Sequence, residues 1–185
     1  ELNMPAIAIT DHGSMYGDID FYKAAKMKGV KPIIGCEVYV APKSRFDKMA
    51  VDGESYYHLI LLAENQQGYK NLIELVSLAY SEGFYYKPRV DKELLRKYHE
   101  GIICLSACIA GEIPAAIIRD NPERADVLVQ EYIDIFGKDN FFIEIQNHGM
   151  PEEKKANVEL VKLAEKYDLG LVATNDSHYT NRNDS

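Results

Sequence analysis

Residues 31–42 have the sequence Lys-Pro-Ile-Ile-Gly-Cys-Glu-Val-Tyr-Val-Ala-Pro. The centre of this run is rich in β-branched and aromatic side chains, which predicts a strand over residues 32–40. One charged side chain, Glu37, interrupts it. A carboxylate in a buried strand needs a hydrogen-bond partner, a positive charge or a metal ion. The run therefore predicts a core strand that also carries part of a polar site.

On both sides of this strand, short apolar runs alternate with amphipathic helical patterns. We predict further strands over residues 6–10, 57–63, 102–105, 141–146 and 171–174. We predict helices over residues 16–28, 91–98, 113–119, 122–136 and 151–167, and one that begins at an Asn65 cap and extends to about residue 79. Residues 41–55 are polar and are predicted to form a loop. This alternation predicts an α/β fold whose six strands form a largely parallel sheet, either open and doubly wound or closed as a barrel.

The composition limits the class of protein. The 185 residues include 21 Lys and Arg against 29 Asp and Glu, which gives a net charge of −8. That charge argues against a broad basic face for DNA, but not against a small pocket of acidic metal ligands. No apolar run is long enough to span a bilayer, and no glycine-rich motif for a dinucleotide or a P-loop occurs. Three cysteines give no disulfide framework, so we expect a reducing cytosol.

Side chains that bind metals occur in or just after the predicted strands. They are Asp11, His12, Glu37, His58, Cys108, His148, Asp176 and His178. Because the carboxyl ends of parallel strands meet at one edge, we expect these side chains to converge. Imidazole, carboxylate and thiolate groups bind Zn²⁺, Mn²⁺ or Fe²⁺. The set predicts a site for two or three metal ions in a hydrolase that acts on phosphate esters.

Each residue alone has a simpler interpretation. Asp11 can cap a helix, Cys108 can be a small buried apolar residue, and His58 can be a core histidine with its hydrogen bonds satisfied. His99 is best explained by the dipole at a helix C-terminus. Cys104 has a zinc-knuckle spacing to Cys108, but it falls in a predicted buried strand, so we expect it in the core.

Several segments resemble one known family. Ile9-Thr-Asp-His-Gly13, residues 31–42 and His58-Leu-Ile-Leu-Leu-Ala63 resemble the PHP (polymerase and histidinol phosphatase) domain. Further segments resemble, in order, the PHP domain of bacterial DNA polymerase III alpha subunits, in the variant without an inserted exonuclease domain. These segments are Gly83-Phe-Tyr-Tyr-Lys-Pro-Arg89, Leu105-Ser-Ala-Cys108, Glu144-Ile-Gln-Asn-His-Gly149 and Ala173-Thr-Asn-Asp-Ser-His-Tyr179. The resemblance covers nearly the whole chain.

The resemblance implies a distorted (β/α)₇ TIM-like barrel with up to nine metal ligands at the ends of its strands. The positions that match ligands by motif are His12, Glu37, His58, Cys108, Asp176 and His178. Asp11 and His148 do not fall on ligand positions, and we expect them to orient the ligands. Arg89 is a candidate for contact with a substrate phosphate, with a plain salt bridge as the alternative.

The family begins with a strand that carries His-x-His, followed by a further ligand, and Glu1 lies after both. We therefore expect residues 1–185 to be one PHP domain fragment that lacks its first strand, three ligands and the downstream polymerase domains. Such a fragment is expected to expose a strand edge and to bind metal more weakly than the complete domain.

For the parent protein, the resemblance implies template-directed DNA synthesis with Mg²⁺ in the bacterial cytoplasm. Its expected partners are primer-template DNA and the other holoenzyme subunits, with no membrane. For the domain we expect Zn²⁺ or Mn²⁺, up to three ions when complete, in a phosphoesterase site of the 3′→5′ exonuclease type. A second hypothesis is a structural metal in a domain that docks the proofreading exonuclease subunit. A third is a free-standing PHP phosphatase.

Overall fold

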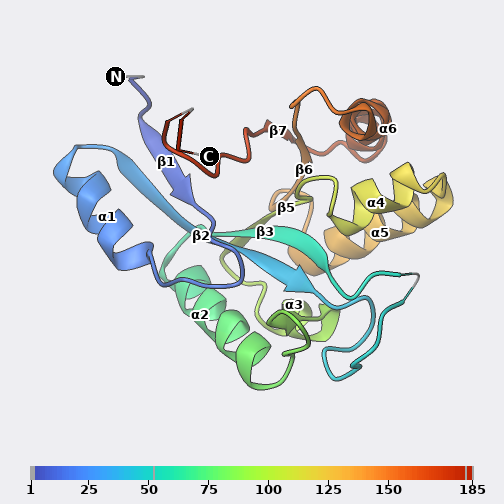
Figure 1. Ribbon diagram of the computed structural model, residues 1–185, viewed down its shortest axis with the longest axis horizontal. Coiled ribbons are helices and arrows are strands. Elements are labelled where there is room, and N and C mark those ends of the chain that lie inside the picture. The colour runs from blue at the N-terminus through green and yellow to red at the C-terminus, as the bar shows by residue number, and fades with distance from the viewer. Residues whose placement is uncertain (1–2, 52, 182, 185) are drawn as a thin grey trace.

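The computed structural model describes residues 3–51, 53–181 and 183–184, which form seven strands and six helices (Figure 1). The strands are β1 (Ala6–Ile9), β2 (Lys31–Val40), β3 (Tyr57–Ala63), β4 (Arg89–Val90), β5 (Ile102–Leu105), β6 (Phe141–Ile145) and β7 (Leu171–Ala173). The helices are α1 (Asp18–Met27), α2 (Gln66–Ser81), α3 (Lys92–Lys97), α4 (Glu112–Ile118), α5 (Pro122–Phe136) and α6 (Pro151–Tyr167). All the predicted elements are present. The structure contains one strand that we did not predict, β4, whose two residues are too few to produce a periodic pattern.

The strands form one mixed sheet in the order β1-β2-β3-β5-β6-β7, and β4 pairs separately with β2. Strand β3 runs antiparallel to both β2 and β5, whereas the remaining pairs are parallel. The prediction of a largely parallel sheet is therefore wrong at the centre. The cause is the loop between β2 and β3. A parallel neighbour needs a crossover element, and the described residues of this loop form no helix, so the chain returns alongside β2 in the opposite direction.

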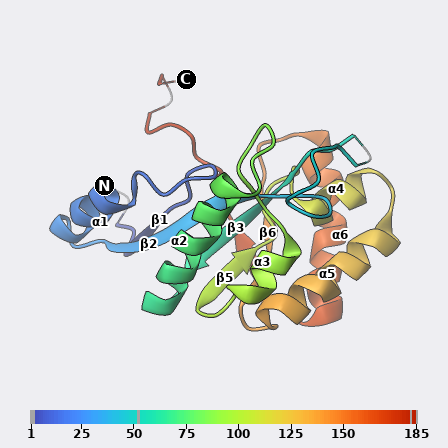
Figure 2. The same cartoon turned by 90° about the horizontal axis from the view of Figure 1, so that it is seen from below.

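The sheet curls into half of a barrel, with the helices on its outer side (Figure 1, Figure 2). Strands β1 and β7 are its two edges, and the chain after β7 returns across the open side toward β1. This geometry decides between the two sheet forms left open by the sequence. It confirms the expected fold class, an incomplete TIM-like barrel.

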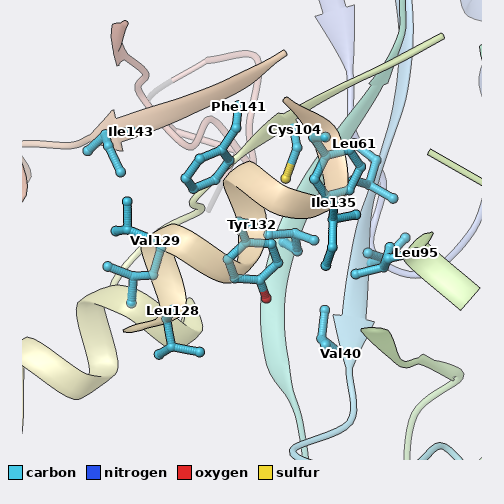
Figure 3. Close-up of a cluster of buried hydrophobic side chains, with 14 of the residues drawn as sticks. Val40, Leu61, Leu95, Cys104, Leu128, Val129, Tyr132, Ile135, Phe141 and Ile143 are labelled. Atoms are coloured by element: carbon cyan, nitrogen blue, oxygen red, sulfur yellow. The ribbon is translucent and has the colours of Figure 1, made fainter. Parts of the chain in front are cut away.

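The main core lies between the sheet and the helices on its outer side, where α5 contributes the largest share in Figure 3. Tyr132 and Ile135 of α5 point toward the strands, and the Tyr132 ring stacks on Phe141 of β6 with a centroid distance of 5.5 Å. Cys104 is fully buried in the same cluster, as expected. Burial of each such large side chain contributes about 1.5–3 kcal/mol to folding.

The opposite, concave face has a second and smaller apolar cluster, formed by alternate residues of the same strands. Its members are Ile60, Leu62, Ile103, Leu105, Ala107, Phe142 and Val172. Since side chains alternate between faces along a strand, Glu37 shares the concave face while Cys36 and Val38 join the main core. The polar site is therefore built on the concave face.

The polar loop after β2 is tied down by two buried arginines. Arg45 donates two hydrogen bonds to the Asp91 carboxylate, at 3.0 and 3.1 Å, and one to Glu82 at 2.7 Å. Arg89 is fully buried and donates to the carbonyl oxygens of Asp47 and Ser55, at 2.8 and 3.0 Å. These bonds fix the loop beside β4, although its sequence predicted only irregular structure.

Asp18, the first residue of α1, is an uncompensated buried acid. It is 2% exposed, and both carboxylate oxygens lack a hydrogen-bond partner among the described residues. Burial, and to a lesser extent the nearby Asp11 carboxylate, raise the pKa of Asp18 from 3.8 to about 6. A negative charge at a helix N-terminus gains about 0.3–1 kcal/mol from the dipole, which is less than this desolvation costs.

We predict that Asp18→Asn stabilises the protein by about 2 kcal/mol at pH 7, since the pKa rise of about two units corresponds to nearly 3 kcal/mol and the dipole offsets part of it. The folded state holds the proton more tightly than the unfolded chain, so wild-type stability falls as pH rises from about 4 to about 6. Urea unfolding from pH 3 to pH 8 measures this. The difference between variant and wild type is expected to vanish below about pH 4.

Asp20, exposed in the same helical turn, is the matched control. Asp20→Asn removes only the favourable dipole interaction and is expected to destabilise by about 0.3–1 kcal/mol. If both variants changed the free energy of unfolding in the same direction at pH 7, the interpretation of Asp18 as a desolvated charge would be contradicted.

Candidate metal centre

The centre is built around Glu37, whose side chain lies on the concave face near the end of β2 and is 6% exposed at the residue level. The backbone of Glu37 also holds the loop after β1. Its N–H donates to the Asp11 carbonyl at 3.1 Å, and its carbonyl accepts from the Gly13 N–H at 2.9 Å. These bonds continue the pairing of β1 with β2 and bring His12 beside Glu37.

His58 reaches the same place from the beginning of β3. Because β3 is antiparallel to β2, its first residues lie at the edge where β2 ends, with His58 opposite Tyr39. The His58 N–H donates to the Ala110 carbonyl at 3.0 Å, which anchors the loop that follows β5. That loop carries Cys108, so the reversal of β3 is what brings imidazole, carboxylate and thiol together.

Glu37, His58 and Cys108 offer one ligand atom each, and these atoms all lie within 4.8 Å of one another. Nδ1 of His58 is 2.5 Å from Oε1 of Glu37 and 3.7 Å from Sγ of Cys108. Nε2 of His12 is 3.5 Å from the same carboxylate oxygen. Four of the predicted ligands thus form one compact group.

The other two predicted ligands belong to the chain that returns after β7. The His178 ring lies with its centroid 5.4 Å from the His12 ring, and its Nδ1 is 3.8 Å from Oδ1 of Asp176. Asp176 and His178 therefore border the group through His12. Across the ranges that the structure describes, the three-atom cluster of Glu37, His58 and Cys108 does not include them.

The group attracts positive charge. Burial opposes the charged form of His58, but hydrogen bonds to Cys108 and Glu37 and the Glu37 charge outweigh it and raise the pKa of His58 to about 9. A nitrogen, an oxygen and a sulfur donor at this spacing match the donor types that bind Zn²⁺ and related ions. The residues present fit a divalent metal.

Asp11 and His148 lie outside this group and differ in what they do. The Asp11 side chain is exposed and raises the pKa of Asp18, while its backbone carbonyl accepts from the Cys36 thiol at 3.3 Å. It does not cap α1, whose cap residue is Gly17. His148 links two segments, with Nδ1 2.5 Å from Oε1 of Glu153 and Nε2 2.9 Å from the carbonyl of Asn175.

Arg89 contradicts both of our sequence interpretations. Its buried guanidinium makes four hydrogen bonds to backbone carbonyls, two of them to Gly83 and Arg45 at 3.1 and 3.2 Å. It forms no ion pair with the carboxylates of the described residues, and because the side chain is fully buried it is not available to a substrate. The residue is structural because its strand, β4, lies beneath a loop that offers several unpaired carbonyls.

Glu144 of β6 is a buried acid that our reading of the sequence missed as a site residue. It is 4% exposed, and its Oε2 has no hydrogen-bond partner within the described part of the chain. Burial raises the pKa of Glu144; Thr174 and Gln146 lower it by hydrogen bonding, and Glu37 and Asp176 raise it. The available signal was the alternation along β6, since Glu144 shares the concave face with Glu37.

The comparisons with known proteins agree with this centre. The PHP domain model matches residues 1–148. The chain belongs to the PHP family. The match includes His12, Glu37, His58 and Cys108, the four residues that form the compact group.

Two curated relatives show how this PHP domain compares with longer proteins. The chain is 53% identical over 184 residues to DNA polymerase III subunit alpha of Thermus aquaticus, which covers 98% of the chain and 15% of that protein. It is 50% identical over 185 residues to DNA polymerase III subunit alpha of Treponema pallidum, covering 100% of the chain and 16% of that protein. The chain thus spans about one sixth of the length of these relatives.

A solved structure with the same fold comes from Bifidobacterium adolescentis and is described provisionally as a metal-dependent phosphoesterase. It aligns with a TM-score of 0.56 and 14% identity, over 100% of this chain and 81% of the other. At this identity the likeness concerns the fold.

None of the described helices is long and apolar enough to cross a membrane.

Proposed function

We propose that this chain is the PHP domain of a DNA polymerase III alpha-type protein, and that its centre binds divalent metal ions and hydrolyses phosphate esters at DNA 3′ ends. The observation that carries the proposal is the compact group of Glu37, His58 and Cys108, with His12 beside it. The names of the relatives support the polymerase context, and the description of the structural neighbour supports the reaction class.

The donor set favours Zn²⁺ or Mn²⁺ over Mg²⁺. A cysteine sulfur suits Zn²⁺ or Fe²⁺, and the carboxylate donor beside it also suits Mn²⁺, whereas Mg²⁺ prefers an all-oxygen set and retains water. Bound at this centre, such ions polarise a phosphoryl oxygen and lower the pKa of water. His12, Glu37, His58 and Cys108 would hold the first ion, and Asp176 with His178 would add a further position when the returning segment closes on His12.

Positioning contacts support this role. Glu37, itself one of the proposed ligands, also contacts the His58 ring, with 2.5 Å between its Oε1 and Nδ1 of His58. His148 holds the backbone at Asn175, next to Asp176, and thereby sets the position of the returning segment. Such partners of metal ligands typically contribute about 10–100-fold in metal affinity or activity.

For the parent protein we propose template-directed DNA synthesis with Mg²⁺, on primer-template DNA and together with the other holoenzyme subunits, in the bacterial cytoplasm. In that protein residues 1–185 would act as a single domain. The reasoning rests on the 53% and 50% identity to two alpha subunits. The free-standing phosphatase receives less support, because the relatives are about six times longer than this chain.

A structural role for the metal is the second candidate, and one observation favours it. The three clustered donors come from β2, from β3 and from the loop after β5, so one ion would cross-link three consecutive neighbours in the sheet. On this hypothesis the domain would serve to dock the proofreading exonuclease subunit.

Metal content and turnover separate the candidates. The full-length parent protein, stripped of metal and then supplied with Zn²⁺ or Mn²⁺, is assayed for bound ions and for hydrolysis of a mispaired DNA 3′ end without nucleotides or pyrophosphate. We expect both binding and turnover, and we expect Cys108→Ser to weaken both. Binding without turnover would overturn the hydrolytic proposal in favour of the structural one. The absence of binding would overturn both.

A further inference from the structure

The segment 83–89 forms a rigid turn against the loop after β2. Tyr85 and Lys87 pair across it, with the Tyr85 N–H donating to the Lys87 carbonyl at 3.0 Å, and Tyr86 at its tip has a left-handed φ of 59°. Buried Arg89 anchors its base by donating to the Gly83 carbonyl. A strained, tightly bonded turn of this kind holds its exposed side chains in fixed positions.

The turn carries Lys87 to the rim of the metal centre. The Lys87 ammonium lies 5.5 Å from the centroid of the Tyr39 ring. The same ring neighbours two of the proposed metal ligands, with centroid distances of 5.4 Å to His58 and 6.4 Å to His12, and it also contacts Tyr56 at 4.9 Å. The turn and the Tyr39 ring both pack closely against Gly13. A Cβ at this position would lie 2.9 Å from the Tyr39 ring and 3.0 Å from Pro88, so the packing requires glycine.

Lys87 is exposed and forms no ion pair within the part of the chain that the structure describes. Beside it, Tyr86 is 73% exposed, and its ring stands edge-on to Tyr85 with a centroid distance of 4.6 Å. In a chain with a net charge of −8, an ammonium without an ion-pair partner among the described residues, at the rim of a metal-ligand group, is a distinctive local feature. Lysine binds phosphate as a point charge, and tyrosine rings stack on nucleobases.

We propose that the turn 83–89 is the substrate-recognition element of the centre, in which Lys87 binds a phosphate of single-stranded DNA and Tyr86 stacks on one of its bases. The inference rests on the proposed function, since it names the substrate class of the same site. It assigns to Lys87 the contact that the sequence had suggested for Arg89. Arg89 instead holds the turn in place through the carbonyl oxygens that it binds.

The test measures binding of a fluorescent single-stranded oligonucleotide to the 185-residue chain by anisotropy, without metal and over a range of salt concentrations. The chain itself is used because the longer relatives have further regions outside the match. Lys87→Met keeps most of the apolar stem and removes the charge. It is expected to weaken binding about tenfold at low salt and to reduce the slope of log affinity against log salt by about 0.7, the value for one phosphate contact on a single strand.

Tyr86→Ala is expected to weaken binding about tenfold without changing that slope, whereas Tyr86→Phe retains the stacking ring and the affinity. Lys97→Met is the matched control, because Lys97 lies 5.0 Å from the Tyr98 ring in a similar cation–π contact but on α3, before β5 begins. It is expected to leave affinity and slope unchanged. Circular dichroism and urea unfolding verify that all variants are folded.

Wild-type protein that does not bind the oligonucleotide, or a Lys87→Met variant that matches Lys97→Met, would overturn the inference. Because binding is measured without metal, its outcome is separate from turnover. Hydrolysis of DNA ends by a parent protein in which Lys87→Met changes nothing would overturn only this inference. A Lys87-dependent affinity in a protein that never hydrolyses DNA would overturn only the proposed reaction.

Discussion

Glu37→Gln is expected to lower the affinity of the centre for Zn²⁺ or Mn²⁺ by at least about 100-fold and to abolish hydrolysis of DNA ends. Glutamine keeps the size of the side chain and can still bond to His58, so the change removes chiefly the negative charge. That charge supplies a first-row metal with an anionic ligand. Even the loss of a residue that only supports a ligand lowers metal affinity or activity by about 10–100-fold. Equilibrium dialysis with metal analysis measures the affinity.

A thermal readout checks the same prediction independently. A metal that binds only the folded state stabilises it by RT ln(1 + [M]/Kd), about 2.7 kcal/mol at 100 times Kd. Added Zn²⁺ should therefore raise the Tm of wild type and leave the Tm of Glu37→Gln nearly unchanged. Glu64→Gln is the control, because Glu64 is exposed just beyond the other end of β3. Retention of the metal-induced rise by Glu37→Gln would show that the carboxylate is not a ligand.

The elements were predictable from local pattern, and the strand directions were not. Asn65 does cap α2, accepting from the N–H groups of Gln67 and Gly68, and Pro122 does begin α5. The direction of β3 depends on what connects it to β2, and the sequence of that connection shows only polarity. Its order comes from buried Arg45 and Arg89, whose partners lie 37 to 46 and 6 to 44 residues away along the chain.

The same distinction applies to the centre. Residue type and position in or just after a strand were enough to nominate His12, Glu37 and Cys108, because ligands gather where parallel strands end. His58 lies beside these residues for a different reason, because it is near the start of β3, which runs antiparallel to β2. Lys87 gave no signal of its own, as its position depends on the Tyr39 ring and on Arg89. Long-range contacts of this kind are absent from any local pattern.

Arg89→Met is expected to destabilise the folded chain by about 3 kcal/mol. The substitution preserves an unbranched apolar stem but removes the donor of the Gly83, Ser55 and Asp47 carbonyl oxygens, whereas the Arg45 carbonyl keeps Lys48 as a donor; each buried unsatisfied group costs about 1–3 kcal/mol. Movement of the loop toward water recovers part of that cost, which sets the estimate near the lower end. Urea unfolding measures the change in the free energy of unfolding.

The same variant should loosen both segments that Arg89 joins. Chymotrypsin is expected to cut after Phe46 and Tyr86 faster than in wild type, because the loop after β2 and the turn 83–89 lose their common anchor. Arg96→Met is the control: Arg96 pairs with Glu131 at 2.9 Å on the surface, and such pairs contribute about 0.2–1 kcal/mol. If the two variants were equally stable and equally resistant to chymotrypsin, Arg89 would not be the residue that holds the rim of the metal centre together.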